Sequence, residues 1–181
     1  LVFKKGYLPA ALEVADAFTL AAGARRTKSR LFDGCQAHVI VELDGQEAAV
    51  RSDLSALQKE IQSIDPIFCR NGFGEEGCEA IWQVRREFSF GLRDTGLTKL
   101  NQDVVVPRGR LEDLFAFAAR LQKKHGIQVA CFGHAGDGNI HVNIMVDRSD
   151  PKQVAKSEGV VDELFRQVMK WDGSVTGEHG V

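Results

Sequence analysis

The amino-acid sequence predicts an α+β domain with a mixed or antiparallel sheet and helices on one face. Segments with the two-residue period of strands alternate with segments whose apolar residues recur every three or four positions, as in helices. Glycine, proline and Asp-Gly turns separate these segments. The second half has the order strand, helix, strand, strand, helix, which is most of a ferredoxin-like unit. The last strand of that unit is expected beyond residue 181.

The first half is predicted to hold one strand among three helices. In chain order these are a helix over 9–25, a strand over 38–43, a helix over 50–64 and a helix over about 79–92. The first of them is rich in alanine, and Pro9 suits an initial helical turn. The strand ends at the turn Asp44-Gly45, after which Leu54 and Ile61 share one helical face.

The second half has clearer boundaries between its elements. They are a strand over 102–106, a helix over 110–124, strands over 128–132 and 140–146, and a helix over 151–171. Pro107 precedes the first of the two helices, and a glycine-rich loop separates the two adjacent strands. We therefore expect helices packed over a sheet.

The composition is that of an ordinary soluble globular protein. The 181 residues are 44% hydrophobic and 27% charged, with a net charge of −2, so no nucleic-acid partner is indicated. No apolar run reaches the roughly 20 residues that cross a membrane. The four cysteines form no C-x-x-C pair and are expected to be free thiols. We expect one domain over 1–181 in the cytoplasm, with peripheral association with the inner membrane left open.

A glycine-rich stretch within 131–145 carries the most informative pattern. Gly133, Gly136 and Gly138 permit a tight turn and should leave His134 on an open loop. The spacing is not that of a dinucleotide-binding loop, because the stretch lies between two strands rather than between a strand and a helix. This stretch therefore predicts a displayed histidine.

A second histidine follows on a predicted strand. From Ile140 onward the residues alternate, so His141, Asn143 and Met145 should point to one face and the apolar residues to the other. A loop histidine and a strand histidine can converge on one metal ion, because imidazole binds zinc, manganese and iron. Either histidine alone is more simply explained as a packed or capping residue.

The third ligand of such a site is offered by another glycine-framed loop, Thr176-Gly-Glu178-His179-Gly. Glu178 would complete a His, His, Glu set with an open coordination position, as a catalytic metal site requires. His179 would then act as a base. The sequence thus predicts a metal site built from His134, His141 and Glu178.

A weaker pattern indicates an anion-binding surface. Arg85 and Ser89 are four positions apart and should share one helix face. A guanidinium group suits a carboxylate, and Lys99, before the following strand, would add a point charge. A solvated basic helix face explains these residues equally well.

Several of these residues resemble a known family, the FAD-linked oxidases of the vanillyl-alcohol-oxidase type. The resemblance is to the C-terminal domain that bacterial glycolate oxidase D-subunits, D-lactate dehydrogenases and D-2-hydroxyglutarate dehydrogenases share. The matching segments are Gly133-His134-Ala-Gly-Asp-Gly-Asn-Ile-His141-Val-Asn143, Gly177-Glu178-His179-Gly180, Trp82-x-x-Arg85, and the weaker Leu8-Pro-Ala-Ala-Leu and Val41-Glu-Leu-Asp-Gly. They extend over almost the whole chain.

The resemblance implies a flavoenzyme of two domains. An FAD-binding domain precedes this domain, which binds the substrate and a metal and covers the flavin as a cap. The metal, usually zinc, is implied at His134, His141 and Glu178, and the base at His179. Arg85 and Asn143 match substrate-binding positions, and Ser89 stands where hydroxyglutarate enzymes have a threonine. Their substrate lysine aligns with Asn101, two positions from Lys99. A piece without the FAD domain is expected to be inactive alone.

Two other classes of function stay open at this point. A metal-dependent hydrolase or lyase would use the same histidines and glutamate without flavin. A non-catalytic α+β binding module would use the glycine loops only as turns. The sequence favours no one substrate among glycolate, D-lactate and D-2-hydroxyglutarate, and it leaves the electron acceptor and the oligomeric state open.

Overall fold

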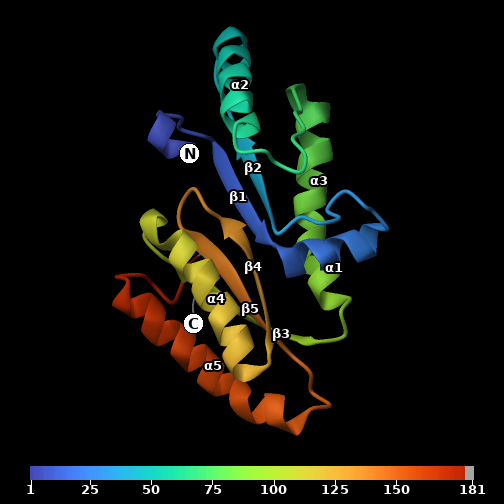
Figure 1. The fold of residues 1–181 in the computed structure, drawn as a ribbon, viewed down its shortest axis with the longest axis vertical. Helices are drawn as coiled ribbons and strands as arrows, with labels where there is room; N and C mark the ends of the chain where they lie inside the picture. Colours follow the sequence, from blue (N-terminus) through green and yellow to red (C-terminus); the bar gives the residue numbers. More distant parts are fainter. Residues whose placement is uncertain (178–181) are drawn as a thin grey trace.

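The structure, a computed structural model, describes residues 1–177 (Figure 1). Short 3-10 helices lie at Phe3–Lys5 and Arg108–Arg110. The other elements are β1 (Ala11–Asp16), α1 (Ala17–Thr27), β2 (Ala37–Glu42), α2 (Glu47–Gln62), α3 (Gly74–Arg93), β3 (Thr98–Val105), α4 (Leu111–His125), β4 (Gln128–His134), β5 (Asn139–Val146) and α5 (Pro151–Lys170).

The five strands form one antiparallel sheet in the order β2-β1-β4-β5-β3. The α+β class and the antiparallel sheet predicted from the sequence are confirmed. The segment from β3 to α5 has the order and pairing of a ferredoxin-like unit. Ser174, after α5, forms an isolated antiparallel bridge with Val105 of β3, with backbone hydrogen bonds of 2.9 and 2.8 Å. This bridge lies where the last strand of such a unit would begin.

Helices cover both faces of the central strands. α4 and α5 pack on one face against Val129, Cys131 and the alternate residues of β3 and β5. α1 and α3 pack on the opposite face, against Ala130 and Phe132. The sequence predicted helices over one face, and α4 and α5 form that layer. α1 and α3 form a second layer on the opposite face, which was not predicted. β4 and β5 are therefore buried on both sides along most of their length.

The predicted helix over 9–25 is wrong in its first part. Residues 11–16 form β1, which is hydrogen-bonded between β2 and β4, and α1 begins only at Ala17. The Asp16 side chain marks the boundary, since it accepts hydrogen bonds from the backbone N–H groups of Thr19 and Cys131 at 2.8 and 2.7 Å. Burial raises the pKa of Asp16. Pairing on both edges outweighed the helical preference of the alanines.

Two other boundaries differ from expectation in a way that affects the site. α3 begins at Gly74 rather than near 79, and its first half extends with α2 beyond the end of the sheet (Figure 1). β3 begins at Thr98, so Lys99 lies within the strand and not before it. Among residues 1–177, no helix has the length and apolar character needed to cross a membrane.

Candidate functional site

The predicted site residues that the structure describes gather on the face of the sheet that α3 covers. The strand register explains this: Glu13 of β1 lies opposite His134 of β4, and Asp103 of β3 lies opposite His141 of β5. Directly opposed residues of antiparallel strands project to the same side. Asn143 lies on this face as well, as the alternation in β5 predicted, whereas Met145 is buried in the apolar part of the face.

The structure brings His134 and His141 together. Their ring centroids are 5.9 Å apart, with an angle of 76° between the planes. His134 is the last residue of β4 rather than a loop residue, and its side chain remains 34% exposed. The turn that follows needs glycine at Gly138, where φ is +81° and a β-carbon would lie 2.0 Å from the carbonyl oxygen of Val106.

A carboxylate faces the Nδ1 atom of each histidine. Glu13 Oε1 contacts His134 Nδ1, and Asp103 Oδ1 lies 3.4 Å from His141 Nδ1. Both carboxylates are buried, at 2% and 8% exposure. Histidines that bind metals commonly have a carboxylate at the second ring nitrogen, which fixes the ring orientation and the tautomer. In this arrangement Nε2 is the atom that would bind a metal.

Two imidazole groups side by side suit a divalent metal, and a complete site needs at least one further ligand. The part of the chain up to residue 177 contains no group of three histidine, cysteine, aspartate or glutamate side chains suited to holding a metal ion. Glu178, the third predicted ligand, and His179, the predicted base, lie outside the described residues. The preceding residue, Gly177, packs against the side chains of Asn139 and Asp103.

Arg85 of α3 reaches the same cluster from above the sheet. Its Nε atom donates to Glu13 Oε2 at 2.5 Å, and its guanidinium lies 4.8 Å from the centre of the Phe132 ring. The Phe132 ring is 5.3 Å from the His141 ring. The Arg85 side chain is only 14% exposed. Arg85 is therefore a mostly covered cation beside the histidine cluster, not part of a solvated helix face.

Ser89, one turn further along α3 than Arg85, pairs with Lys99 of β3. Lys99 Nζ donates to Ser89 Oγ at 3.1 Å. Burial, and to a lesser degree the charge of Arg93, lowers the pKa of Lys99. The pair provides a cation and a hydroxyl on the same side of α3 as Arg85, since Arg85 and Ser89 are four residues apart.

Asn143 is fully buried beneath these groups. Its amide nitrogen donates to the carbonyl oxygens of Ala130 and His141 at 3.1 and 3.0 Å. Its amide oxygen has no hydrogen-bond partner among the residues that the structure describes. A buried acceptor without a donor is uncommon in folded proteins and is a place where a bound ligand or water fits.

Glu13 and Asp103 were missed in the sequence. Glu13 stands between apolar residues in Ala-Leu-Glu-Val-Ala, and Asp103 directly precedes three valines in Gln-Asp-Val-Val-Val. The signal was that a charge in a buried strand needs a partner. The partner could not be named without the strand order.

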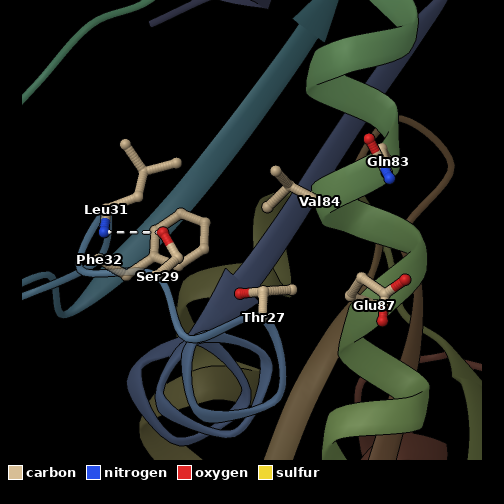
Figure 2. A pocket seen from close by; sticks show the side chains of 7 residues that line it. All are labelled: Thr27, Ser29, Leu31, Phe32, Gln83, Val84 and Glu87. Atoms are coloured by element: carbon tan, nitrogen blue, oxygen red, sulfur yellow. Dashed lines mark hydrogen bonds between the residues drawn. The ribbon is translucent and has the colours of Figure 1, made fainter.

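A hollow of about 260 Å³ lies elsewhere, between α3 and the loop that follows α1. Figure 2 shows Gln83 and Glu87 projecting from α3 and, across the hollow, Ser29, whose hydroxyl oxygen accepts a hydrogen bond from the Leu31 N–H at 3.1 Å. None of the predicted site residues lines this hollow. The histidine cluster is therefore a separate feature of the molecule.

Comparison with known proteins gives relatives along the whole chain. It is 28% identical over 174 residues to the glycolate oxidase subunit GlcD of Bacillus subtilis, covering 96% of this chain and 37% of the relative. It is 31% identical over 110 residues to a probable mitochondrial D-lactate dehydrogenase of Danio rerio, covering 59% of this chain and 22% of the relative. The chain thus spans little more than a third of the curated glycolate oxidase subunits it matches.

The fold has a counterpart among solved structures. A 4-ethylphenol oxidase from Gulosibacter chungangensis, in its isoeugenol complex, superposes with a TM-score of 0.61 at 16% identity, over 91% of this chain and 38% of that one. At this identity the likeness concerns the fold alone. The family model described as FAD linked oxidases, C-terminal domain, matches residues 1–181. The chain belongs to the C-terminal domain family of the FAD-linked oxidases.

Proposed function

We propose that this chain is the substrate- and metal-binding domain of an FAD-dependent 2-hydroxyacid oxidoreductase. The observation that carries the proposal is the pair of histidines, each with a carboxylate near Nδ1, beside a mostly covered arginine. Membership of the FAD-linked oxidase family supports the cofactor, and relatives named glycolate oxidase and D-lactate dehydrogenase support the substrate class. The remainder of such an enzyme would bind the flavin. We therefore expect residues 1–181 alone not to oxidise a 2-hydroxyacid.

His134, His141 and Glu178 would hold a divalent metal, with zinc the simplest choice for nitrogen and carboxylate ligands. When bound, the metal lowers the pKa of a coordinated hydroxyl, and the flavin accepts a hydride. Glu13 and Asp103, which face Nδ1 of the two imidazole rings, would fix the ring orientation for metal binding through Nε2. This chain thus supplies ligand geometry and electrostatics, and the electron chemistry belongs to the cofactor.

The remaining residues would bind the acid and move its proton. The Nε atom of Arg85 donates to Glu13. The terminal guanidinium nitrogens would therefore face the substrate carboxylate. His179 would accept the hydroxyl proton, since a neutral imidazole has a pKa near the working pH. Loss of that proton and of the hydride on the α-carbon converts the 2-hydroxyacid into a 2-oxoacid. Asn143, Ser89 and Lys99 would contact the rest of the substrate.

The test uses the full-length protein and a variant with both His134→Ala and His141→Ala. Elemental analysis, flavin absorbance and dye-linked oxidation of glycolate, D-lactate and D-2-hydroxyglutarate are measured. We expect about one divalent metal and one FAD per chain in the wild type. The variant should lose the metal and the oxidation and retain the FAD.

His125→Ala is the matched control, because His125 contacts Glu163 on the opposite layer of helices. This variant should keep the metal, the FAD and the activity. Metal without flavin in the wild type would contradict the proposal and favour a hydrolase or lyase. Absence of both would favour a non-catalytic module.

A further inference from the structure

We infer that Glu13 is a positioning residue that holds the substrate arginine and one metal-binding histidine in a fixed relation to each other. The inference rests on the proposed function and extends it to a residue outside the predicted site. The two carboxylate oxygens of Glu13 have different partners: Oε1 contacts His134 Nδ1, and Oε2 accepts from Arg85 Nε at 2.5 Å. One carboxylate thus joins the two groups.

The backbone leaves Glu13 little freedom. It lies in the middle of β1, directly opposite His134 in β4, and β1 is hydrogen-bonded to strands on both sides. The side chain is 3% exposed. From this position the Glu13 side chain contacts the imidazole of His134 in the neighbouring strand and the guanidinium of Arg85 on α3. One side chain held in this way therefore contacts both Arg85 and His134.

Charge gives Glu13 a second role. The Arg85 side chain is 14% exposed, and a buried guanidinium without a counter-charge is strongly unfavourable. Glu13 supplies the counter-charge, and the ring of Phe132 lies against the cation from another side. Without the carboxylate, Arg85 would be expected to turn toward solvent and lose the orientation that a substrate carboxylate requires.

Asp103 provides an internal comparison. It lies opposite His141 as Glu13 lies opposite His134, and its contact with His141 Nδ1 is 3.4 Å. No contact with Arg85 is observed for it within residues 1–177. If each carboxylate orients a metal ligand, then only the loss of Glu13 should also weaken substrate binding through Arg85.

The test is Glu13→Gln in the full-length protein. A glutamine has one acceptor oxygen and one donor nitrogen, so it can keep at most one of the two contacts. We expect the dissociation constant for Zn²⁺, measured by chelator competition, to rise about tenfold or more. With saturating Zn²⁺, we expect KM for the 2-hydroxyacid to rise about tenfold and kcat to change less.

Three further variants separate the roles. Asp103→Asn should weaken Zn²⁺ binding and leave KM at saturating Zn²⁺ near the wild-type value. Glu42→Gln should change neither, because Glu42 accepts from Trp82 Nε1 at 2.6 Å and touches neither Arg85 nor His134. If Glu13→Gln does not fold, Glu13→Gln combined with Arg85→Met removes both buried charges. In that variant weakened Zn²⁺ binding tests the contact with His134.

The possible outcomes are distinct. A wild-type protein that binds Zn²⁺ and oxidises a 2-hydroxyacid, with Glu13→Gln equal to it in both constants, overturns the inference about Glu13 alone. A rise in KM for Asp103→Asn equal to that for Glu13→Gln also overturns it, because the arginine would then not be the cause. A wild type without metal or 2-hydroxyacid oxidation overturns the proposed function first.

Discussion

The backbone of Gly177 lies directly against the side chain of Asn139. A β-carbon at residue 177 would come 2.5 Å from Asn139 Nδ2 and 2.8 Å from Asp103 Oδ1. Asp103 is the carboxylate that faces His141. The chain therefore passes the histidine cluster, immediately before Glu178, at a distance that only a glycine permits.

Gly177→Ala should consequently impair the site more than the fold. The methyl group must displace Asn139, Asp103 or its own loop, and a displacement of about 1 Å at such a site lowers catalysis roughly a hundredfold. We expect kcat/KM of the full-length enzyme to fall by about that factor, with a small change in melting temperature. Gly159→Ala in α5 is the control, since nothing lies within 4 Å of its added methyl group. Equal kcat/KM for the two variants would refute the role of this contact.

Arg85→Lys tests the guanidinium group. A lysine keeps the charge and cannot donate to Glu13 and to a substrate carboxylate in the same planar arrangement. KM for the 2-hydroxyacid should rise roughly tenfold to a hundredfold in steady-state assays. Arg86→Lys is the neighbouring control, because Arg86 is half exposed and pairs with Glu79 on the surface. A similar KM for both variants would show that Arg85 does not bind the acid.

His38 should make the domain less stable in mild acid. Its ring lies among Phe32, Phe68 and Phe88, with centroids 5.1, 5.9 and 6.5 Å away, and burial lowers its pKa. The unfolded chain then binds a proton at His38 more readily than the folded one. Stability is thus fully present above the unfolded pKa of about 6.5 and is lost as the pH falls through the lowered folded value.

Urea unfolding of wild type and His38→Phe between pH 7.5 and 5 measures this effect. The wild type should lose more stability than the variant over that interval, because phenylalanine carries no proton. Parallel pH curves for the two proteins would contradict the assignment to His38.

Gly138→Ala should destabilise the turn that follows His134. At φ +81° an alanine is strained, and its methyl group would meet the Val106 carbonyl oxygen at 2.0 Å. The same turn is held by a 3.0 Å hydrogen bond from the Val106 N–H to the Gly138 carbonyl oxygen. We expect a loss of about 2 kcal/mol or more in the free energy of unfolding. Gly109→Ala, with open space around the added methyl group, should stay close to wild type.

Local patterns predicted most of the elements. α5 follows a capping aspartate, Asp150, whose side chain accepts from the Lys152 N–H at 2.8 Å, with proline at the next position. β1 was missed because Ala11–Asp16 is short and alanine-rich, and it becomes a strand only by pairing with β2 and β4. Helical preference acts between near neighbours, whereas strand formation depends on segments far away in the chain.

The sequence predicted the position of some site residues and not of others. The glycine turn between the two histidines brings them together over a few residues, so the motif alone indicated their convergence. Lys99 was expected before its strand and lies within it, where it reaches Ser89. The burial of Arg85 was not foreseeable, because it depends on how closely α3 packs over Phe132.

By itself, the sequence determined the fold class, the histidine pair and the family to which the chain belongs, because these depend on periodicity and on motifs of adjacent residues. Only the tertiary structure decided which carboxylate lies at Nδ1 of each histidine. Glu13 and His134 are 121 positions apart in the chain and meet because β1 pairs with β4 in one register. A shift of that register by one residue would turn Glu13 to the other face of the sheet and leave Arg85 and His134 without their common partner.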